Sequence, residues 1–100
     1  MATYRIENTV VKTENATNQY SEQRDWDGSN HIGRSSRSQW HYQTLHRSRK
    51  GRYYLEFQSG VQGERDHAEW VSPEEAARWL LFNEHEIPAE LAAAAESVSE

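Results

Sequence analysis

Alternating aromatic and polar residues in the middle of the chain predict a β-hairpin. Two such runs flank residues 48–51, where Gly51 can take the left-handed conformation of a three-residue loop with a bulge. This register places Leu45 opposite Leu55 and assigns every second residue to the same face. One face, predicted to be core, carries Leu45, Tyr53, Leu55 and Phe57. The other face, which is aromatic and polar, carries Trp40, Tyr42, Thr44, His46, Tyr54 and Glu56.

A clear helix signal follows the hairpin. Ser72, Pro73 and Glu75 have the spacing of a capping box with proline in the first turn. The helix is predicted to run to about Asn83, with Trp79 at one margin of its core face. The core face itself is predicted to consist of Ala76, Ala77, Leu80 and Leu81.

The flanking segments give further elements of the C-terminal half. Residues 67–71 predict a third strand between the hairpin and the helix. Pro88 predicts the start of another helix over residues 89–98. Residues 92–100 are expected to fray, because their alanine run favours helix but offers little surface for packing.

The N-terminal part of the chain has a weaker pattern. Residues 3–12 alternate enough to predict one strand or two short ones. Residues 13–38 are poor in aliphatic side chains and predict a long loop, with a strand near Tyr20 or Trp26 as an alternative. We therefore expect a single α+β domain over residues 1–100, an antiparallel β-meander of three to four strands followed by one or two C-terminal helices packed on the sheet.

Composition narrows the classes of protein. Hydrophobic residues make up 35% of the chain and charged residues 27%, a low apolar share that agrees with a long loop. The chain has no cysteine, which excludes disulfides, thiolate chemistry and cysteine-based zinc sites. Its apolar runs, such as residues 79–82, are far too short to cross a bilayer, and no signal peptide is evident. A cytoplasmic protein without a membrane partner is expected.

Charges are strongly segregated along the chain, whose formal net charge is −5. Residues 31–54 contain six basic residues and no acidic one, whereas residues 55–100 contain eleven acidic residues and two basic ones. A cationic segment of this kind suits an anionic partner. It can equally be neutralised by the acidic C-terminal helices of the same chain, and the sequence leaves both interpretations open.

The hairpin and the helix resemble a pattern shared by small proteins of bacteria and their mobile elements. In that group a hairpin of the form Tyr-Arg-Thr-x-Lys-Gly-x-Tyr-x-Leu precedes a helix of the form Ser-x-Glu-Glu-Ala-x-x-Trp-Leu. The matching segments here are residues 45–55 and 70–80, and the resemblance extends over roughly residues 40–91. Asn83 and Glu84 stand where the group has Asn-Gly at the end of the helix. The resemblance implies the order of the elements and assigns no activity and no binding residue.

Basic and aromatic side chains alternate through the hairpin and the segment before it. The candidate binding residues are Arg34, Arg37, Trp40, Tyr42, His46, Arg47, Arg49, Lys50, Arg52 and Tyr54. Our leading hypothesis is a small non-catalytic interaction module, such as a regulator, inhibitor or accessory subunit. It would bind a protein partner, or a second copy of itself, through its sheet face, because aromatic residues are enriched at protein interfaces. The alternative is single-stranded DNA or RNA binding through residues 31–54, because cations contact phosphates and rings stack on unpaired bases.

The sequence indicates no catalytic centre, no metal site and no cofactor. His41 and His46 are five residues apart, so on one strand they face opposite sides and cannot share a metal ion. Residues 25–30 contain aspartates and a glycine but lack the spacing of a calcium loop, and an Asp-Gly turn is predicted instead. No phosphate-binding loop, nucleophile elbow or dinucleotide fingerprint occurs. We expect the protein not to be an enzyme.

Overall fold

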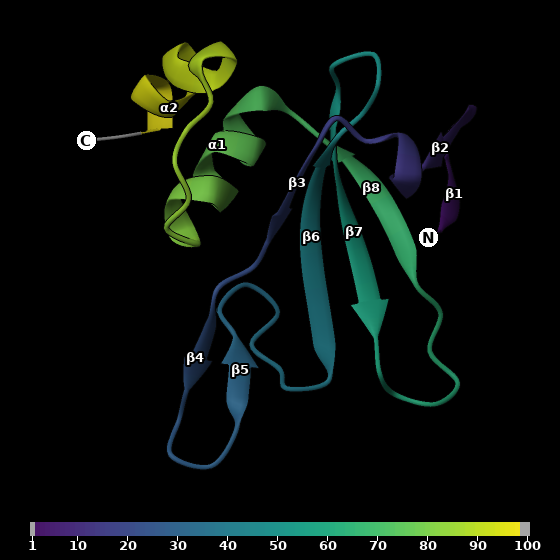
Figure 1. Cartoon of the computed structure of the whole chain (residues 1–100), viewed down its shortest axis with the longest axis vertical. Helices are drawn as coiled ribbons and strands as arrows, with labels where there is room; N and C mark the ends of the chain where they lie inside the picture. Colours follow the sequence, from purple (N-terminus) through teal and green to yellow (C-terminus); the bar gives the residue numbers. More distant parts are fainter. Residues whose placement is uncertain (1, 99–100) are drawn as a thin grey trace.

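The computed structural model describes residues 2–98, which form a twisted sheet with further layers on both of its faces (Figure 1). The sheet has four antiparallel strands in the order β3, β6, β7, β8. Their bounds are Asn18–Ser21 for β3, His41–Arg47 for β6, Tyr53–Ser59 for β7 and His67–Val71 for β8. Strands β6, β7 and β8 follow one another as a meander, and helices come after them, so the predicted α+β architecture is confirmed.

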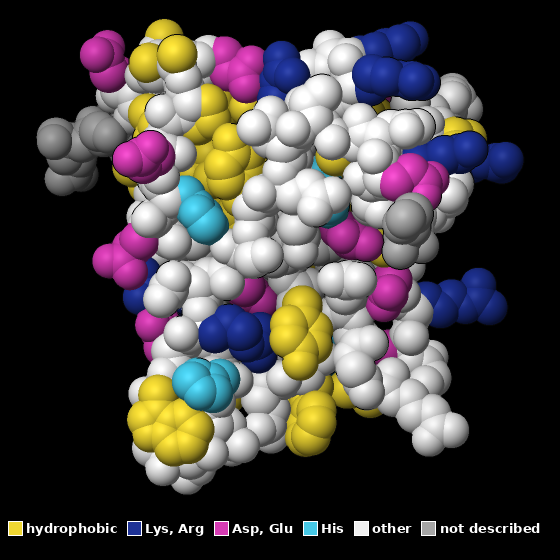
Figure 2. All heavy atoms as spheres, in the orientation of Figure 1, with side chains coloured by type: hydrophobic (Ala, Val, Ile, Leu, Met, Phe, Trp, Pro, Cys, Tyr) yellow, Lys and Arg dark blue, Asp and Glu magenta, His cyan; other side chains and the backbone are white. Residues whose placement is uncertain are grey.

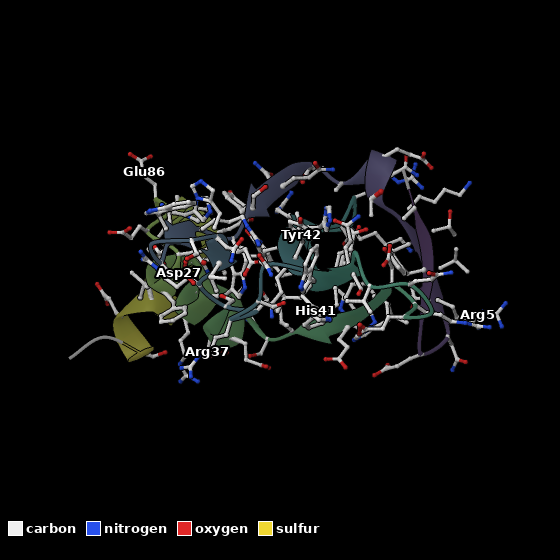
Figure 3. All side chains as sticks on the ribbon, turned by 90° about the horizontal axis from the view of Figure 1, so that it is seen from below. Arg5, Asp27, Arg37, His41, Tyr42 and Glu86 are labelled. Atoms are coloured by element: carbon white, nitrogen blue, oxygen red, sulfur yellow. The ribbon has the colours of Figure 1, made fainter. Side chains whose placement is uncertain are left out.

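Helices cover one face of the sheet and an N-terminal hairpin covers the other. The helices are α1 (Pro73–Phe82) and α2 (Ala92–Val98), and the 3₁₀ turn η2 (Ala89–Leu91) precedes α2. The hairpin pairs β1 (Thr3–Ile6) with β2 (Thr9–Lys12), which is the two-strand form of the N-terminal prediction. Seen along the strands of the sheet, the helices lie to one side and β1–β2 to the other (Figure 3). The protein therefore has three layers.

The central hairpin has the register that its sequence predicts. Leu45 pairs with Leu55, and the amide of Ser48 donates to the carbonyl of Arg52 at 2.7 Å. Gly51 closes the turn with a φ of 90°, a conformation that glycine adopts without strain. The third strand of the meander coincides with the predicted residues 67–71.

Each face of the sheet has its own hydrophobic cluster. On the helix side the buried members are Leu45, Tyr53, Ala76, Trp79, Leu80 and Leu91. On the side of β1–β2 they are Tyr4, Ile6, Val11 and Tyr54. Because successive residues of a strand point to opposite faces, the neighbours Tyr53 and Tyr54 enter different clusters. The half of β6–β7 near the 48–51 turn is therefore buried on both faces.

Helix α1 begins as predicted but buries a different set of side chains. The Ser72 hydroxyl accepts from the Glu75 amide at 3.1 Å and the Glu75 carboxylate accepts from the Ser72 amide at 3.2 Å, which confirms the capping box. Leu81, predicted to be core, is 43% exposed, whereas Trp79 is buried. The reason lies beyond α1, where the chain turns back and packs Leu91 into the cluster that contains Trp79.

Helix α1 ends in a regular C-terminal motif although Glu84 stands where a glycine was expected. The His85 amide donates to the Leu80 carbonyl at 2.9 Å, and the Glu84 amide donates to the Leu81 carbonyl at 3.2 Å. This is the Schellman pattern, which requires a left-handed residue. Glu84 takes that conformation with a φ of 59°, at a cost of about 1–2 kcal/mol for a residue with a side chain. Its carboxylate is bound by Arg34 at 3.1 Å.

The prediction of a long loop over residues 13–38 is wrong. Besides β3, the segment forms a 3₁₀ turn and two further strands: η1 (Thr13–Asn15), β4 (Arg24–Trp26) and β5 (His31–Gly33). Strands β4 and β5 pair as a separate hairpin at the end of the sheet opposite the 48–51 turn (Figure 1). Both alternatives, a strand near Tyr20 and one near Trp26, are present. These strands are largely exposed, so their sequences lack the apolar alternation by which strands are recognised.

The second helix begins later than predicted. Pro88 precedes the turn η2, and α-helical geometry starts only at Ala92. Residues 92–98 form α2, so the expected fraying of this segment stays a prediction. Residues 99 and 100, to which the same expectation applied, lie outside the described residues.

Substitution of two leucines, one buried and one exposed, tests which side chains form the core. Leu45 is 0% exposed, so Leu45→Ala should lower the free energy of unfolding by about 2–5 kcal/mol because it leaves a cavity. Leu81→Ala, the matched control, should cost less than about 1 kcal/mol because that side chain is largely in water. Leu55, predicted to be buried opposite Leu45, is partly buried against the same cluster and is a weaker probe. Urea unfolding followed by circular dichroism measures both variants, and equal losses would contradict this packing.

Candidate functional site

Polar side chains on the hairpin side of the sheet are buried and paired with one another. Glu56, which is 5% exposed, accepts a hydrogen bond from the Tyr4 hydroxyl and lies 2.8 Å from His46 Nε2. Burial and the neighbouring Glu56 carboxylate raise the pKa of Tyr4 well above its usual range. Because Tyr4 lies on β1, this network fastens the β1–β2 hairpin over β6 and β7.

Two of the predicted binding residues, His46 and Tyr54, belong to this buried layer. His46 is 2% exposed and Tyr54 is 0% exposed, and their rings stack with centroids 5.0 Å apart. The sequence placed both on an open sheet face, because nothing in the local pattern shows that β1–β2 covers it. Their rings are enclosed by the protein, so neither offers a surface for base stacking.

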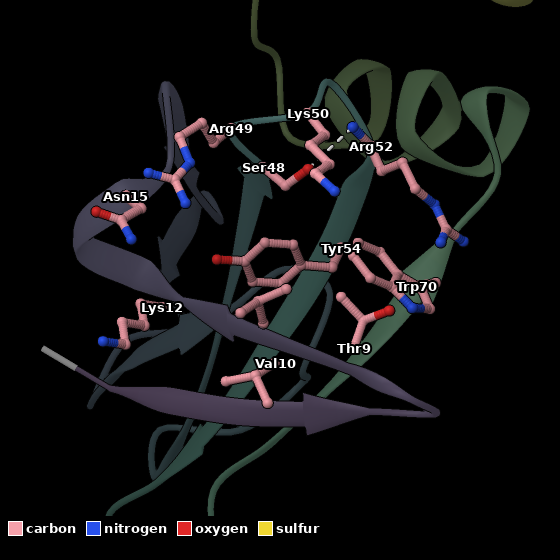
Figure 4. A pocket seen from close by; sticks show the side chains of 11 residues that line it. Thr9, Val10, Lys12, Asn15, Ser48, Arg49, Lys50, Arg52, Tyr54 and Trp70 are labelled. Carbon is pink, nitrogen blue, oxygen red and sulfur yellow. Dashed lines mark hydrogen bonds between the residues drawn. The ribbon is translucent and has the colours of Figure 1, made fainter.

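A groove opens between β2 and the turn that follows β6 (Figure 4). Its volume is about 420 Å³, and no acidic side chain lines it. The basic side chains in its lining are Lys12, Arg49, Lys50 and Arg52. The aromatic ones are Tyr54 and Trp70. We call this site the cationic groove.

The basic side chains of the cationic groove are not neutralised by the protein. Among the described residues, Lys12, Arg49 and Lys50 form no ion pair. Arg52 instead lies over the ring of Trp70, with its guanidinium carbon 3.9 Å from the ring centroid. Figure 2 shows Lys and Arg side chains gathered at this end of the molecule. The groove is therefore a region of uncompensated positive charge.

The aromatic lining of the groove carries two hydrogen-bond donors without acceptors. Tyr54 Oη and Trp70 Nε1 are buried and have no hydrogen-bond partner among residues 2–98. Burial and the Glu56 carboxylate raise the pKa of Tyr54 to about 12, so its hydroxyl keeps its proton at neutral pH. In Figure 4 this hydroxyl points toward the end of the groove where Asn15 lies.

Other predicted binding residues serve the fold. Arg34 binds Asp25 at 2.9 Å, and this guanidinium holds the pKa of the Asp25 carboxyl below its usual range. Arg47 binds Glu90, just before α2, at 2.8 Å. Arg34 also binds Glu84, so neutralisation of the basic segment by the acidic C-terminal half is confirmed for Arg34 and Arg47 and does not extend to the groove. Arg37 is exposed and lies outside the groove.

Three exposed aromatic side chains mark the opposite end of the sheet. Trp26, Trp40 and Tyr42 are 61%, 57% and 43% exposed. The guanidinium of Arg24 lies over the Tyr42 ring, 4.4 Å from its centroid, and donates to the carbonyls of Ser38 and His41. Figure 2 shows hydrophobic side chains at the surface of this end, and Tyr42 lies near its centre when seen from below (Figure 3). We call Trp26, Trp40 and Tyr42 the aromatic end.

A buried carboxylate holds the aromatic end in place. The side chain of Glu22 is 2% exposed and binds Arg24 at 3.2 Å. It also accepts hydrogen bonds from the backbone amides of Ser35, Ser36 and Gln43. A Cβ atom at Gly33 would lie 2.5 Å from Glu22 Oε1, so a larger residue there would displace the carboxylate. Glu22 thus joins the segment after β5 to the start of β6.

Sequence reasoning missed Lys12, Glu22, Arg24 and Trp26 as residues of these sites. The predicted Asp-Gly turn is present, with Gly28 at a φ of 102°. The amides of Asn30 and Ser29 bind Asp27 and hold the pKa of its carboxyl below the usual range. This turn joins β4 to β5, so it was the one sequence signal that could have located the hairpin that presents Trp26.

The histidines of β6 pair with carboxylates and form no metal site with the other described residues. His41 lies 3.0 Å from the Glu64 carboxylate, whereas His46 contacts Glu56 on the other side of β6, as their spacing predicts. Among the described residues, no three His, Asp or Glu side chains come close enough to hold a metal ion. Within residues 2–98, no helix is long and apolar enough to span a membrane.

A pair of tyrosine variants tests the buried network. Tyr4→Phe should lower the free energy of unfolding by about 1–3 kcal/mol, because it deprives the buried Glu56 carboxylate of a donor. Tyr54→Phe should leave stability unchanged or raise it, because the hydroxyl that it removes has no partner among residues 2–98. Thermal and urea unfolding compare the two. Equal losses of stability in the two variants would show that the Tyr54 hydroxyl already has a hydrogen-bond partner. That result would contradict the unpaired donor described in the groove.

Comparison with protein-family models, with curated proteins and with solved structures gives no significant match. The resemblance to small bacterial and mobile-element proteins therefore stays a prediction. Functional proposals for this chain rest on the residues of the cationic groove and of the aromatic end.

Proposed function

We propose that the protein is a small non-catalytic interaction module, a regulator, inhibitor or accessory subunit, that binds a protein partner through its aromatic end. The exposure of Trp26, Trp40 and Tyr42 on one end of the sheet carries this proposal. Tryptophan, tyrosine and arginine dominate the binding energy of protein interfaces, because they bury a large area and still make polar contacts. Arg24, which lies over Tyr42, adds the third of these residue types.

The aromatic end is well suited to binding because its supports are rigid. The Gly60 amide donates to the Trp40 carbonyl at 2.7 Å, which extends the β6–β7 pairing to Trp40. Trp40 directly precedes β6 and Tyr42 is the second residue of that strand, so both are held close to the β6–β7 pairing. Arg24 is fixed by Glu22 and by backbone carbonyls. Little conformational entropy is then lost when a partner binds.

Single-stranded nucleic-acid binding through residues 31–54 is less favoured by this geometry. Such binding needs cations and exposed rings along one path, so that phosphates and bases are contacted in succession. Here the unpaired cations Arg49 and Lys50 are on the turn that follows β6, whereas Trp40 and Tyr42 are at the start of β6 and Trp26 is on β4, at the other end of the sheet (Figure 1). At the basic end, Trp70 is covered by Arg52 and Tyr54 is buried.

Affinity capture with the full chain tests the proposal, followed by titration of the captured protein in purified form. The triple variant Trp26→Ser, Trp40→Ser and Tyr42→Ser should weaken binding by about thirtyfold or more, since loss of one hot-spot residue costs about 2 kcal/mol. The matched control is Leu81→Ser with Phe82→Ser, which changes side chains that are 43% and 50% exposed on α1. This control should bind like the parent.

Sedimentation velocity decides whether the partner is a second copy of the chain. A parent that dimerises and a triple variant that stays monomeric would identify the aromatic end as a self-contact. Binding that survives the triple variant, or that the control loses to the same extent, would contradict the proposal. Circular dichroism of all variants confirms that they are folded.

A further inference from the structure

The cationic groove is separate from the aromatic end and takes no part in the proposed protein contact. We propose that the groove binds a phosphorylated small molecule of about mononucleotide size. Lys12, Arg49 and Lys50 would hold the phosphate group, and the apolar lining would contact the rest of the molecule.

Charge is the first support for an anionic ligand. The chain has a net charge of −5, yet four of its eleven basic residues line this one groove and no acidic residue does. The repulsion among clustered cations is unfavourable in the empty groove and is relieved by a bound anion. A phosphate monoester carries nearly two negative charges at neutral pH and forms charge-assisted hydrogen bonds with lysine and arginine.

Unpaired donors are the second support. Tyr54 Oη and Trp70 Nε1 both belong to side chains of the groove lining, and neither has an acceptor among residues 2–98. Buried donors without partners are rare in folded proteins because each costs about 1–3 kcal/mol. A phosphate has several acceptor oxygens, and one bound at the Asn15 end of the groove can accept from the Tyr54 hydroxyl, which points there (Figure 4). Tyr54 is 0% exposed, so its position is fixed before the ligand binds.

Size and apolar surface point to a ligand larger than phosphate itself. The groove volume of about 420 Å³ lies within the range of small-molecule sites, roughly 300–1,000 Å³. Val10, in the wall of the groove, is 58% exposed. Its side chain therefore offers apolar contact to the part of the ligand that carries the phosphate. A compact ligand fits better than a polymer, because the groove has no free ring face on which successive bases could stack.

Calorimetric titration at low ionic strength tests the proposal with adenosine monophosphate as the probe. We expect a dissociation constant below about 1 mM at low ionic strength. Added salt should raise this constant, because it screens the attraction between the phosphate and the basic side chains. Adenosine, which lacks only the phosphate, should not bind. In a ¹⁵N-labelled protein, the amide shifts caused by adenosine monophosphate should centre on residues 9–15 and 48–54.

Variants distinguish specific binding in the groove from general attraction of the anion to positively charged side chains. Arg49→Ala with Lys50→Ala should weaken binding by about tenfold or more, the effect of losing one charge-assisted hydrogen bond. The matched control, Arg65→Ala with Arg78→Ala, removes the same charge from exposed sites outside the groove and should bind like the parent. Tyr54→Phe should weaken binding without lowering the melting temperature.

Three outcomes would overturn the inference. The first is no heat and no shift with adenosine monophosphate, and the second is equal weakening by the two double variants. The third is tight binding of a single-stranded oligonucleotide in the absence of any binding of the mononucleotide, which would make the groove a nucleic-acid surface. The triple variant of the aromatic end should bind adenosine monophosphate normally, so the failure of either proposal is distinguishable from failure of the other.

Discussion

The buried carboxylate of Glu56 is the constraint on which the rest of the structure depends. It points from β7 into the space between the sheet and β1–β2, where an unpaired carboxylate would cost several kcal/mol. Tyr4 and His46 supply its partners, and Tyr4 can do so only if the N-terminal hairpin lies across this face. The same placement buries Tyr54 and leaves its hydroxyl without an acceptor. The three-layer architecture is therefore the way in which the chain satisfies a polar group at a core position.

The position of β1–β2 also divides the surface into two chemically distinct parts. Over the half of the sheet near the 48–51 turn, the hairpin covers the aromatic residues and forms one wall of the cationic groove (Figure 4). Over the other half the sheet is uncovered, and Glu22 anchors the segment that presents the aromatic end. The unpaired cations Arg49 and Lys50 and the exposed rings of Trp40 and Tyr42, which lie close together in the sequence, are thus held at opposite ends of β6. One end suits an anion, and the other suits a protein surface.

Local signals in the sequence were sufficient for the central hairpin and for α1. Gly51 and the capping box of Ser72 and Glu75 act within a few residues, so their geometry can be predicted from spacing alone. Contacts between distant segments, such as Tyr4 with Glu56, hold β1–β2 over the sheet. Similar contacts, such as Glu22 with Gln43, position the strands within residues 13–38. No local periodicity records these contacts. As a result, the sequence identified Arg49, Lys50 and Arg52 but not Lys12, which lies on β2, the other wall of the groove.

The division of the sheet into a covered half and an open half is the central claim, and the four tryptophans report on it directly. Their indole N–H signals can be followed by nuclear magnetic resonance in the presence of a water-soluble paramagnetic agent, which broadens exposed groups. Trp26 and Trp40 should broaden, since they are 61% and 57% exposed. The signals of Trp70, whose Nε1 is buried beside the groove, and of Trp79, which donates to Gln43 at 3.0 Å, should stay sharp. Broadening of the Trp70 signal to the same extent as that of Trp26 would show that β1–β2 does not cover the sheet, and would contradict the account.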